Sequence, residues 1–287
     1  IIYSILIKIN IILSMIDFSN SFVDRSLPTI SISEILGLLQ EPFDQKGVAT
    51  KTYNKHFNNP ESEYYQKSVE QICEMWSAKG AESCRYGSLL DDYIGLNLKG
   101  TEDELELWKL DNNYEWDERL LGHCTAFDDF FTLMNANGDV EFIDREKTVY
   151  YQVGNYYVKG RFDALFRNKK TGKWIIIDWK SSGSIDKIPN QWTKKLFGPA
   201  MKFPALNYYT YTMQLHFYKK ALIANYFPEG TTEDDIVVMI VNLPSKMIES
   251  INKTYETHLE AFKYDSMLME QIFSFGIKKK ELLNKKK

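Results

Sequence analysis

Three carboxylates and a lysine in the middle of the sequence have a spacing that would suit metal-dependent hydrolysis. Glu146, Asp163 and Asp178 fall in three successive strand-like segments, and Lys180 follows Asp178 by two residues. Like charges directly opposite each other destabilise a sheet, so facing carboxylates make physical sense where a cation binds them. Mg²⁺ takes one or two carboxylates and keeps water and phosphate oxygens for its other positions. The backbone carbonyl of Trp179 is a further candidate ligand.

The roles of the four residues follow from the same chemistry. A divalent cation held by Asp163 and Asp178 would supply a water nucleophile at neutral pH, as phosphodiester hydrolysis requires. Lys180 is predicted on the same strand face as Asp178, where its ammonium could orient or help deprotonate that water. Glu146 could hold a second ion or an outer water.

Two turns set the predicted register of the three strands. The Gly154 hairpin has the two-residue form that joins antiparallel strands, and it sets Glu146 opposite Asp163. The longer loop ending at Gly172 sets Asp163 opposite Asp178. The same register aligns the polar faces of the strands, and a slip of one residue would destroy that agreement.

Alternation of side chains predicts one core face and one mostly polar face for this sheet. Leu165, Trp174 and Ile176 are assigned to the polar face with Asp178 and Lys180. The core face of the middle strand is predicted to consist of Tyr156, Val158, Gly160, Phe162, Ala164 and Phe166.

Two further groups are candidate substrate-binding residues. Gln214 and Tyr218 lie four apart on a predicted helix and therefore share a face; either could hydrogen-bond the lysine or a phosphate, and Tyr218 could also stack on a base. Lys194 and Lys195 belong to a lysine cluster just after the strands. That cluster is either a local nucleic-acid contact or a solvated loop.

The remaining elements are predicted from periodicity and capping signals, and together they indicate a mixed α/β fold with an N-terminal helical portion. A capping box, Ser31 with Glu34, predicts a short helix. The other predicted elements are helices over 61–80, 83–97, 115–135, 208–226 and 250–277, strands between 141 and 181, and a buried strand over 236–243.

Composition narrows the class of protein. A chain of 287 residues with 44% hydrophobic content can form one substantial core, and we expect a single domain over 15–277. The apolar stretch 1–14 is interpreted as a prefix preceding a natural start at Met15, with a membrane-anchoring or partner-binding segment as the rival interpretation. Residues 278–287 are expected to be a solvated Lys-rich tail.

Charge and cysteine content also exclude some functions. The net charge of −4 provides no global basic field for nucleic acid, so such binding must be local. Three widely spaced cysteines without a CxxC pair argue against a disulfide framework, a structural zinc site and a four-cysteine iron–sulfur cluster. A reducing, cytoplasmic compartment fits best, without secretion and without a membrane partner.

The combined pattern resembles the PD-(D/E)XK nuclease superfamily, in particular its RecB-like exonuclease branch, which includes mitochondrial and phage or viral nucleases. The matching residues are Glu146, Gly160-Arg-Phe-Asp163, Asp178-Trp-Lys180 and Gln214-x-x-x-Tyr218. The resemblance implies a restriction-endonuclease-like core: a three-strand antiparallel meander followed by a helix and a further strand. It also implies Mg²⁺- or Mn²⁺-dependent cleavage of DNA, by an exonuclease on single-stranded or end-processed DNA in replication, repair or recombination.

The resemblance extends upstream with one departure. The stretch from Trp76 to Asp91 looks like the family's W…G…G-T-x-x-H helix, with Asp91 where many members carry a metal-binding histidine. Two alternatives to a deoxyribonuclease stay open at this point. One is a non-catalytic DNA-binding or assembly module with the same fold, and the other is a metal-dependent ribonuclease or other phosphohydrolase.

Overall fold

The computed structural model describes residues 16–245 and 255–286. Two compact units make up the chain: unit 1 combines the segment up to Gln40 with the segment from Leu121 onward, and unit 2 consists of Glu41–Leu120. The sequence predicted one domain over 15–277. The predicted prefix 1–14 lies outside the described residues.

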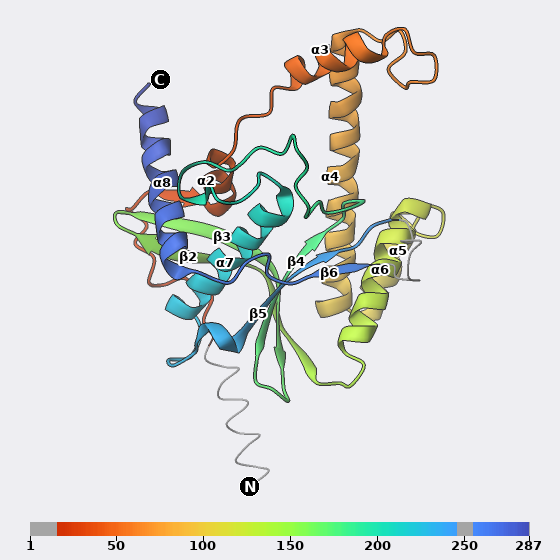
Figure 1. The fold of residues 1–287 in the computed structure, drawn as a ribbon. Helices are drawn as coiled ribbons and strands as arrows, with labels where there is room; N and C mark the ends of the chain where they lie inside the picture. Colours follow the sequence, from red (N-terminus) through yellow and green to blue (C-terminus); the bar gives the residue numbers. More distant parts are fainter. Residues whose placement is uncertain (1–15, 246–254, 287) are drawn as a thin grey trace. The chain divides into compact units, whose positions relative to one another are not determined.

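Unit 1 contains a six-stranded mixed sheet, so the chain has the mixed α/β fold that its sequence predicts (Figure 1). The strands are β1 (Thr29–Ser31), β2 (Val140–Val153), β3 (Tyr156–Asn168), β4 (Trp174–Lys180), β5 (Ile236–Asn242) and β6 (Glu256–His258). β2, β3 and β4 form the predicted antiparallel meander. β5 lies parallel to β4, and β1 lies parallel to the start of β3. The two three-residue strands, β1 and β6, were not predicted.

The predicted register is confirmed on both sides of β3. Arg145 pairs with Ala164 and Lys147 pairs with Phe162, so Glu146 lies opposite Asp163. On the other edge Ala164 pairs with Ile177, which places Asp178 next in line with Asp163. The hairpin turn and the longer loop therefore align the three carboxylates as their spacing requires.

The predicted alternation of a core face and a polar face does not hold along the whole of β3. Phe162 and Leu165 pack in the same hydrophobic core although they have opposite parity along β3. Glu146, which lies on β2 opposite Asp163, has a φ of +55°, in the left-handed region. Both strands are therefore distorted here, as at a β-bulge. As a result Leu165, Trp174 and Ile176, which were predicted on a polar face, are buried in the core.

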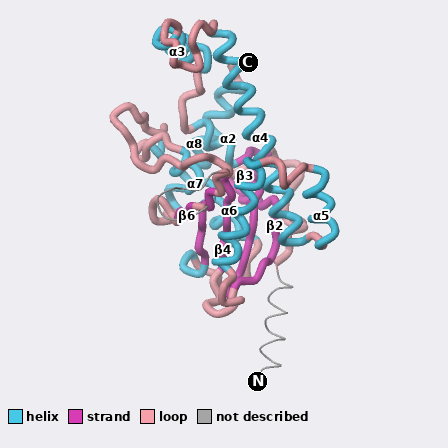
Figure 2. Tube along the Cα trace, turned by 90° about the vertical axis from the view of Figure 1, so that its right-hand side faces the viewer, coloured by secondary structure: helices cyan, strands magenta, loops and turns pink. Residues whose placement is uncertain are grey.

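Helices cover both faces of the sheet, which explains why so few strand residues stay polar (Figure 2). α7 (Asn207–Asn225) packs on one face and is buried on nearly all sides, as expected of a central helix. α6 (Glu118–Met134) covers the other face, where Phe127 and Phe130 meet the edge of Trp179. Among the described helices, none is both long enough and apolar enough to cross a bilayer.

The remaining elements of unit 1 flank α7. α2 (Ile32–Leu38) begins at the Ser31 cap, whose side chain accepts a hydrogen bond from the Glu34 N–H at 3.0 Å, as predicted. Two short 3₁₀ helices, η1 (Gly198–Ala200) and η2 (Glu233–Asp235), precede and follow α7.

The C-terminal elements differ from the prediction. The helix expected over 250–277 is instead β6 followed by α8 (Ser266–Asn284), and residues 250–254 lie outside the described residues. Part of the expected Lys-rich tail belongs to α8. There Lys279 donates to the Leu38 carbonyl at 2.7 Å, and Lys280 forms an ion pair with Glu34.

Unit 2 is helical: α3 (Gln45–His56), α4 (Val69–Lys99) and α5 (Glu102–Asp111). The two helices predicted over 61–80 and 83–97 are one continuous helix, α4, which starts at a capping box formed by Ser68 and Gln71. Gly80 does not interrupt it, since a single glycine lowers helix stability by only about 1 kcal/mol. The predicted helix over 115–135 corresponds to α6, whereas α5 was not predicted.

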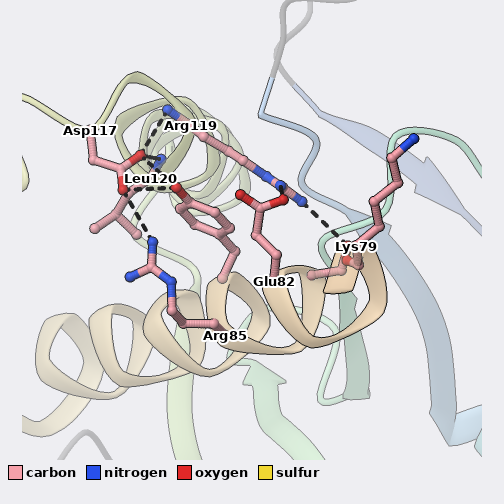
Figure 3. Close-up of polar contacts among 8 residues, drawn as sticks. Lys79, Glu82, Arg85, Asp117, Arg119 and Leu120 are labelled. Atoms are coloured by element: carbon pink, nitrogen blue, oxygen red, sulfur yellow. Dashed lines mark hydrogen bonds and ion pairs between the residues drawn. The ribbon is translucent and has the colours of Figure 1, made fainter. Parts of the chain in front are cut away.

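A polar cluster stabilises unit 2 next to the start of α6 (Figure 3). Asp117 accepts hydrogen bonds from the Leu120 N–H at 3.0 Å and from the Tyr86 hydroxyl at 2.9 Å. Arg119 forms an ion pair with Glu82 at 3.2 Å. Because Tyr86 and Glu82 lie on α4, these contacts join α4 to the first residues of α6.

The segment between β6 and α8 is held against α7 by the half-buried carboxylate of Glu260. Glu260 accepts from the Lys219 ammonium at 3.0 Å and lies 3.7 Å from His216 Nε2. The rings of Phe262 and Tyr264 meet His216 edge-on. Burial raises the pKa of Glu260, but the contacts with His216 and Lys219 outweigh burial and lower it to about 2.

We expect Glu260→Gln to destabilise the protein in a pH-dependent way. The depressed pKa of Glu260 stabilises the folded state above the carboxyl's ordinary value of 4.5, and this contribution disappears as the pH falls toward about 2. Urea unfolding at pH 7 should show a loss of about 2 kcal/mol, which shrinks toward zero as the pH is lowered to about 2. Glu229→Gln, at an exposed position, is the control, and an equal loss at both pH values for Glu260→Gln would contradict this account.

Candidate active site

The predicted residues meet at a gap in the edge of β3. β2 pairs with β3 along one edge, whereas β1 and β4 share the other: β1 pairs with Tyr157–Lys159 and β4 with Ala164–Arg167. Between these two stretches the backbone of β3 has no partner on that edge among the described strands. The Tyr218 side chain bonds to this backbone instead, and the candidate site lies at this gap.

Asp178 and Lys180 form a close, nearly dry ion pair at the end of β4. The side chain of Asp178 is 1% exposed, and its Oδ2 lies 2.5 Å from the Lys180 ammonium. Its other oxygen, Oδ1, has no hydrogen-bond donor in the described part of the chain. A buried carboxylate oxygen without a donor is costly, so Asp178 retains capacity for a further positive partner.

Asp163 adds a second carboxylate to the same place. One of its oxygens accepts a hydrogen bond from the Trp179 N–H at 2.7 Å. Burial, followed by the negative charge of Asp178, raises the pKa of Asp163 to about 8, although Lys180 and the Trp179 N–H counteract the rise. Near neutral pH the two carboxyl groups therefore hold a proton between them, unless a bound cation takes the place of that proton.

Lys180 is held as an ammonium. Burial lowers the pKa of Lys180, but the negative charges of Asp178 and Asp163 outweigh burial and raise it. The ammonium also lies 4.5 Å from the ring centre of Tyr211 on α7, a cation–π distance. The sequence prediction did not include Tyr211 in the site. Its spacing from Gln214 and Tyr218 puts all three on one helical face, and this signal would have identified it.

Gln214 and Tyr218 reach the gap from α7. The Tyr218 hydroxyl donates to the Arg161 carbonyl at 2.7 Å, which is one of the β3 groups without a strand partner. Gln214 Nε2 donates to the Tyr218 hydroxyl at 2.6 Å. Burial and the nearby charge of Asp178 raise the pKa of Tyr218 well above its ordinary value. Within the described residues Gln214 therefore supports Tyr218, whereas the sequence predicted a hydrogen bond to the lysine or to a phosphate.

Glu146 belongs to the site's rim and not to a three-carboxylate cluster. Its carboxylate forms an ion pair with Arg161 at 2.7 Å. Among the described residues, no group of three Asp, Glu, His or Cys side chains is arranged to hold one metal ion. The register thus aligns Glu146 with Asp163, but the distortion at Glu146 directs its side chain toward Arg161.

A pocket of about 450 Å³ opens onto Asp163. Its walls come from the β1–α2 junction, β2, β3 and α7, and they include Lys159, Arg161, Gln214 and Tyr218. Gly160 forms part of the wall, and a Cβ there would come within 2.7 Å of the Phe217 ring and 2.8 Å of the Tyr218 ring. The absent side chain lets α7 approach β3 and bring its polar groups to the gap.

The other predicted residues stay predictions. In a strand the N–H and C=O of one residue face the same neighbour. The Lys180 carbonyl accepts from Leu243 on the β5 side, so the carbonyl of Trp179 faces Asp163 on β3. Asp91 lies on α4 in unit 2. Lys194 and Lys195 lie in the loop between β4 and α7.

Comparisons with known proteins find little resemblance. No family model matches the chain, and no curated protein matches it. Two solved structures align over most of its length. One is SSO0001, with 13% identity and a TM-score of 0.34, covering 89% of this chain and 77% of that one. The other, described as a candidate exonuclease from Eubacterium rectale, has 9% identity and a TM-score of 0.41, covering 90% and 81%. Neither similarity is high enough to support a conclusion about this chain.

We expect Asp163→Asn to abolish stabilisation by divalent cations. The substitution removes one of the two crowded carboxylates and leaves the Asp178–Lys180 pair intact. Urea unfolding of the unmodified protein should show a gain of about 3 kcal/mol with Mn²⁺ at 100 times its dissociation constant, relative to EDTA. The Asp163→Asn variant should gain nothing, and in EDTA it should be at least as stable as the unmodified protein.

Asp186→Asn, at an exposed position in the following loop, is the matched control and should retain the gain with Mn²⁺. Equal stabilisation of the Asp163→Asn variant and the unmodified protein would show that the cation binds elsewhere.

Proposed function

We propose that this protein is a Mg²⁺- or Mn²⁺-dependent deoxyribonuclease that hydrolyses phosphodiester bonds at the gap beside β3. The observation that carries the proposal is the buried pair Asp163 and Asp178, held beside Lys180, of which Asp163 lines a pocket with basic walls. Two adjacent carboxylates are the donor set of a hard divalent cation that also takes phosphate oxygens. The raised pKa of Asp163 and the unsatisfied Oδ1 of Asp178 fit such a cation.

Each residue then has a defined task. Asp163 and Asp178 would hold the ion, with the Trp179 carbonyl as a further ligand. A bound divalent cation lowers the pKa of water and neutralises charge on a phosphate. Lys180, fixed by Asp178 and by the ring of Tyr211, would orient the attacking water with its ammonium.

The pocket supplies contacts for the substrate. Lys159 and Arg161 line it, and their positive charges suit the phosphates on either side of the bond that is cut. Gln214 and Tyr218 hold the Arg161 backbone in place, which fixes the side of the pocket next to Asp163. Glu146 balances the Arg161 charge and so influences how strongly that side chain attracts a phosphate.

A non-catalytic module of the same fold is less well supported. Burial of two carboxylates and a lysine costs stability, and a protein that only bound DNA would gain nothing from that cost. A ribonuclease or another phosphohydrolase would use the same residues, so the substrates in the assay decide between these activities.

The test is a cleavage assay with end-labelled single- and double-stranded DNA and RNA in Mg²⁺, Mn²⁺ or EDTA. We expect metal-dependent products from DNA and none in EDTA. Lys180→Met should lower the rate about 100-fold or more, the usual range for loss of a group that acts on the proton of a nucleophile. Lys170→Met, at an exposed position in the β3–β4 turn, should leave the rate unchanged.

Several results would contradict the proposal. Absence of product from every substrate would exclude an enzyme of this class, and product from RNA alone would make it a ribonuclease. Circular DNA serves as a further arm, because we propose an exonuclease acting in replication, repair or recombination. An exonuclease should cut the linear form and spare the circle.

A further inference from the structure

We propose that the loop between β4 and α7, residues 181–206, is a docking surface for single-stranded DNA, with Trp192 as the residue on which an unpaired base stacks. This inference rests on the proposed function and specifies its substrate class. We call residues 181–206 the site loop.

Both ends of the site loop are fixed at the candidate active site (Figure 1). The loop starts directly after Lys180, where the Ser182 hydroxyl donates to Asn242 on β5 at 3.0 Å. It returns to α7, whose first turns carry Tyr211 over the Lys180 ammonium. A strand bound along the loop would therefore lead to the carboxylates.

Trp192 lies on a turn that is held by hydrogen bonds. The Asn190 side chain accepts hydrogen bonds from the Trp192 N–H at 2.8 Å and from the Thr193 hydroxyl at 3.2 Å, and the Thr193 hydroxyl accepts one from the Asn190 N–H at 2.9 Å. The indole of Trp192 is 81% exposed and the neighbouring Ile188 is 87% exposed. An indole this exposed, on a turn fixed by its own hydrogen bonds, offers an open ring face on which a base can stack.

The charge of the site loop favours a polyanion as the occupant. The loop carries four lysines and one carboxylate, in a chain whose net charge is −4. The lysines are Lys187, Lys194, Lys195 and Lys202, and the carboxylate is Asp186. Aromatic stacking combined with a basic track is the usual way in which proteins bind single strands. A protein partner would need only the apolar side chains, and the lysines would then have no counterpart.

The stacking geometry selects a single strand over a duplex. In a duplex both faces of an internal base are covered by its neighbours, so an indole at the surface has no base face to meet. An unpaired strand exposes these faces, and stacking on an aromatic side chain tolerates any base. The site loop therefore suits an unpaired strand that passes from Trp192 toward Asp163.

The experiment measures binding without cleavage. Fluorescence anisotropy in EDTA follows a labelled oligothymidylate and a blunt duplex against the full chain and its Trp192→Ala, Trp192→Phe and Trp116→Ala variants. Trp116 is 85% exposed and lies in unit 2, so it is the matched control. We expect Trp192→Ala to weaken single-strand binding about tenfold. Trp192→Phe should keep most of the affinity, Trp116→Ala all of it, and duplex binding should not change.

The outcomes separate this inference from the proposed function. Equal single-strand affinity of the unmodified protein and Trp192→Ala, with circular dichroism unchanged, would overturn the inference, as would failure of the unmodified protein to bind a single strand. Metal-dependent cleavage could still occur in either case. Conversely, Trp192-dependent binding without cleavage in any metal would support the docking surface and contradict the proposed nuclease activity.

Discussion

The repulsion between Asp163 and Asp178, confined to the interior between the sheet and α7, is the constraint on which the rest of the structure depends. Two carboxylates with little access to water destabilise each other, and the pKa of Asp163 rises to about 8 in response. Lys180 compensates only part of this charge, because its ammonium contacts one oxygen of Asp178. A fold that tolerates such a pair must hold it in place with its surroundings.

The surroundings do so by leaving one edge of β3 without a partner, among the described strands, where the carboxylates meet. β1 and β4 divide one edge of β3 between them, and the free backbone between them bonds to α7 through Tyr218. The close approach of α7 depends on Gly160, where any side chain would collide with the Phe217 and Tyr218 rings. The same gap gives the pocket its access to Asp163. This one break in strand pairing therefore brings the two carboxylates together, lets α7 bond to β3, and opens the pocket onto Asp163.

The sequence predicts the register and the ligands because both follow from local rules. A two-residue turn at Gly154 and a loop ending at Gly172 determine which strand residues face each other, and the structure keeps that register. The change in which side chains of β3 face α7 accompanies a left-handed backbone at Glu146, and no local sequence pattern predicts that conformation. Leu165 was therefore assigned to a polar face, although it packs in the same core as Phe162. α8 begins later than predicted because residues 255–265 form β6 and the contacts of Glu260, which are long-range.

Diffraction from crystals grown with Mn²⁺, measured with its anomalous signal, tests most directly whether the carboxylate pair is a cation site. The account predicts an anomalous peak about 2–2.5 Å from oxygens of both Asp163 and Asp178, with Lys180 retained beside Asp178. A peak at another place in the molecule, with the pair bound only to Lys180, would contradict it.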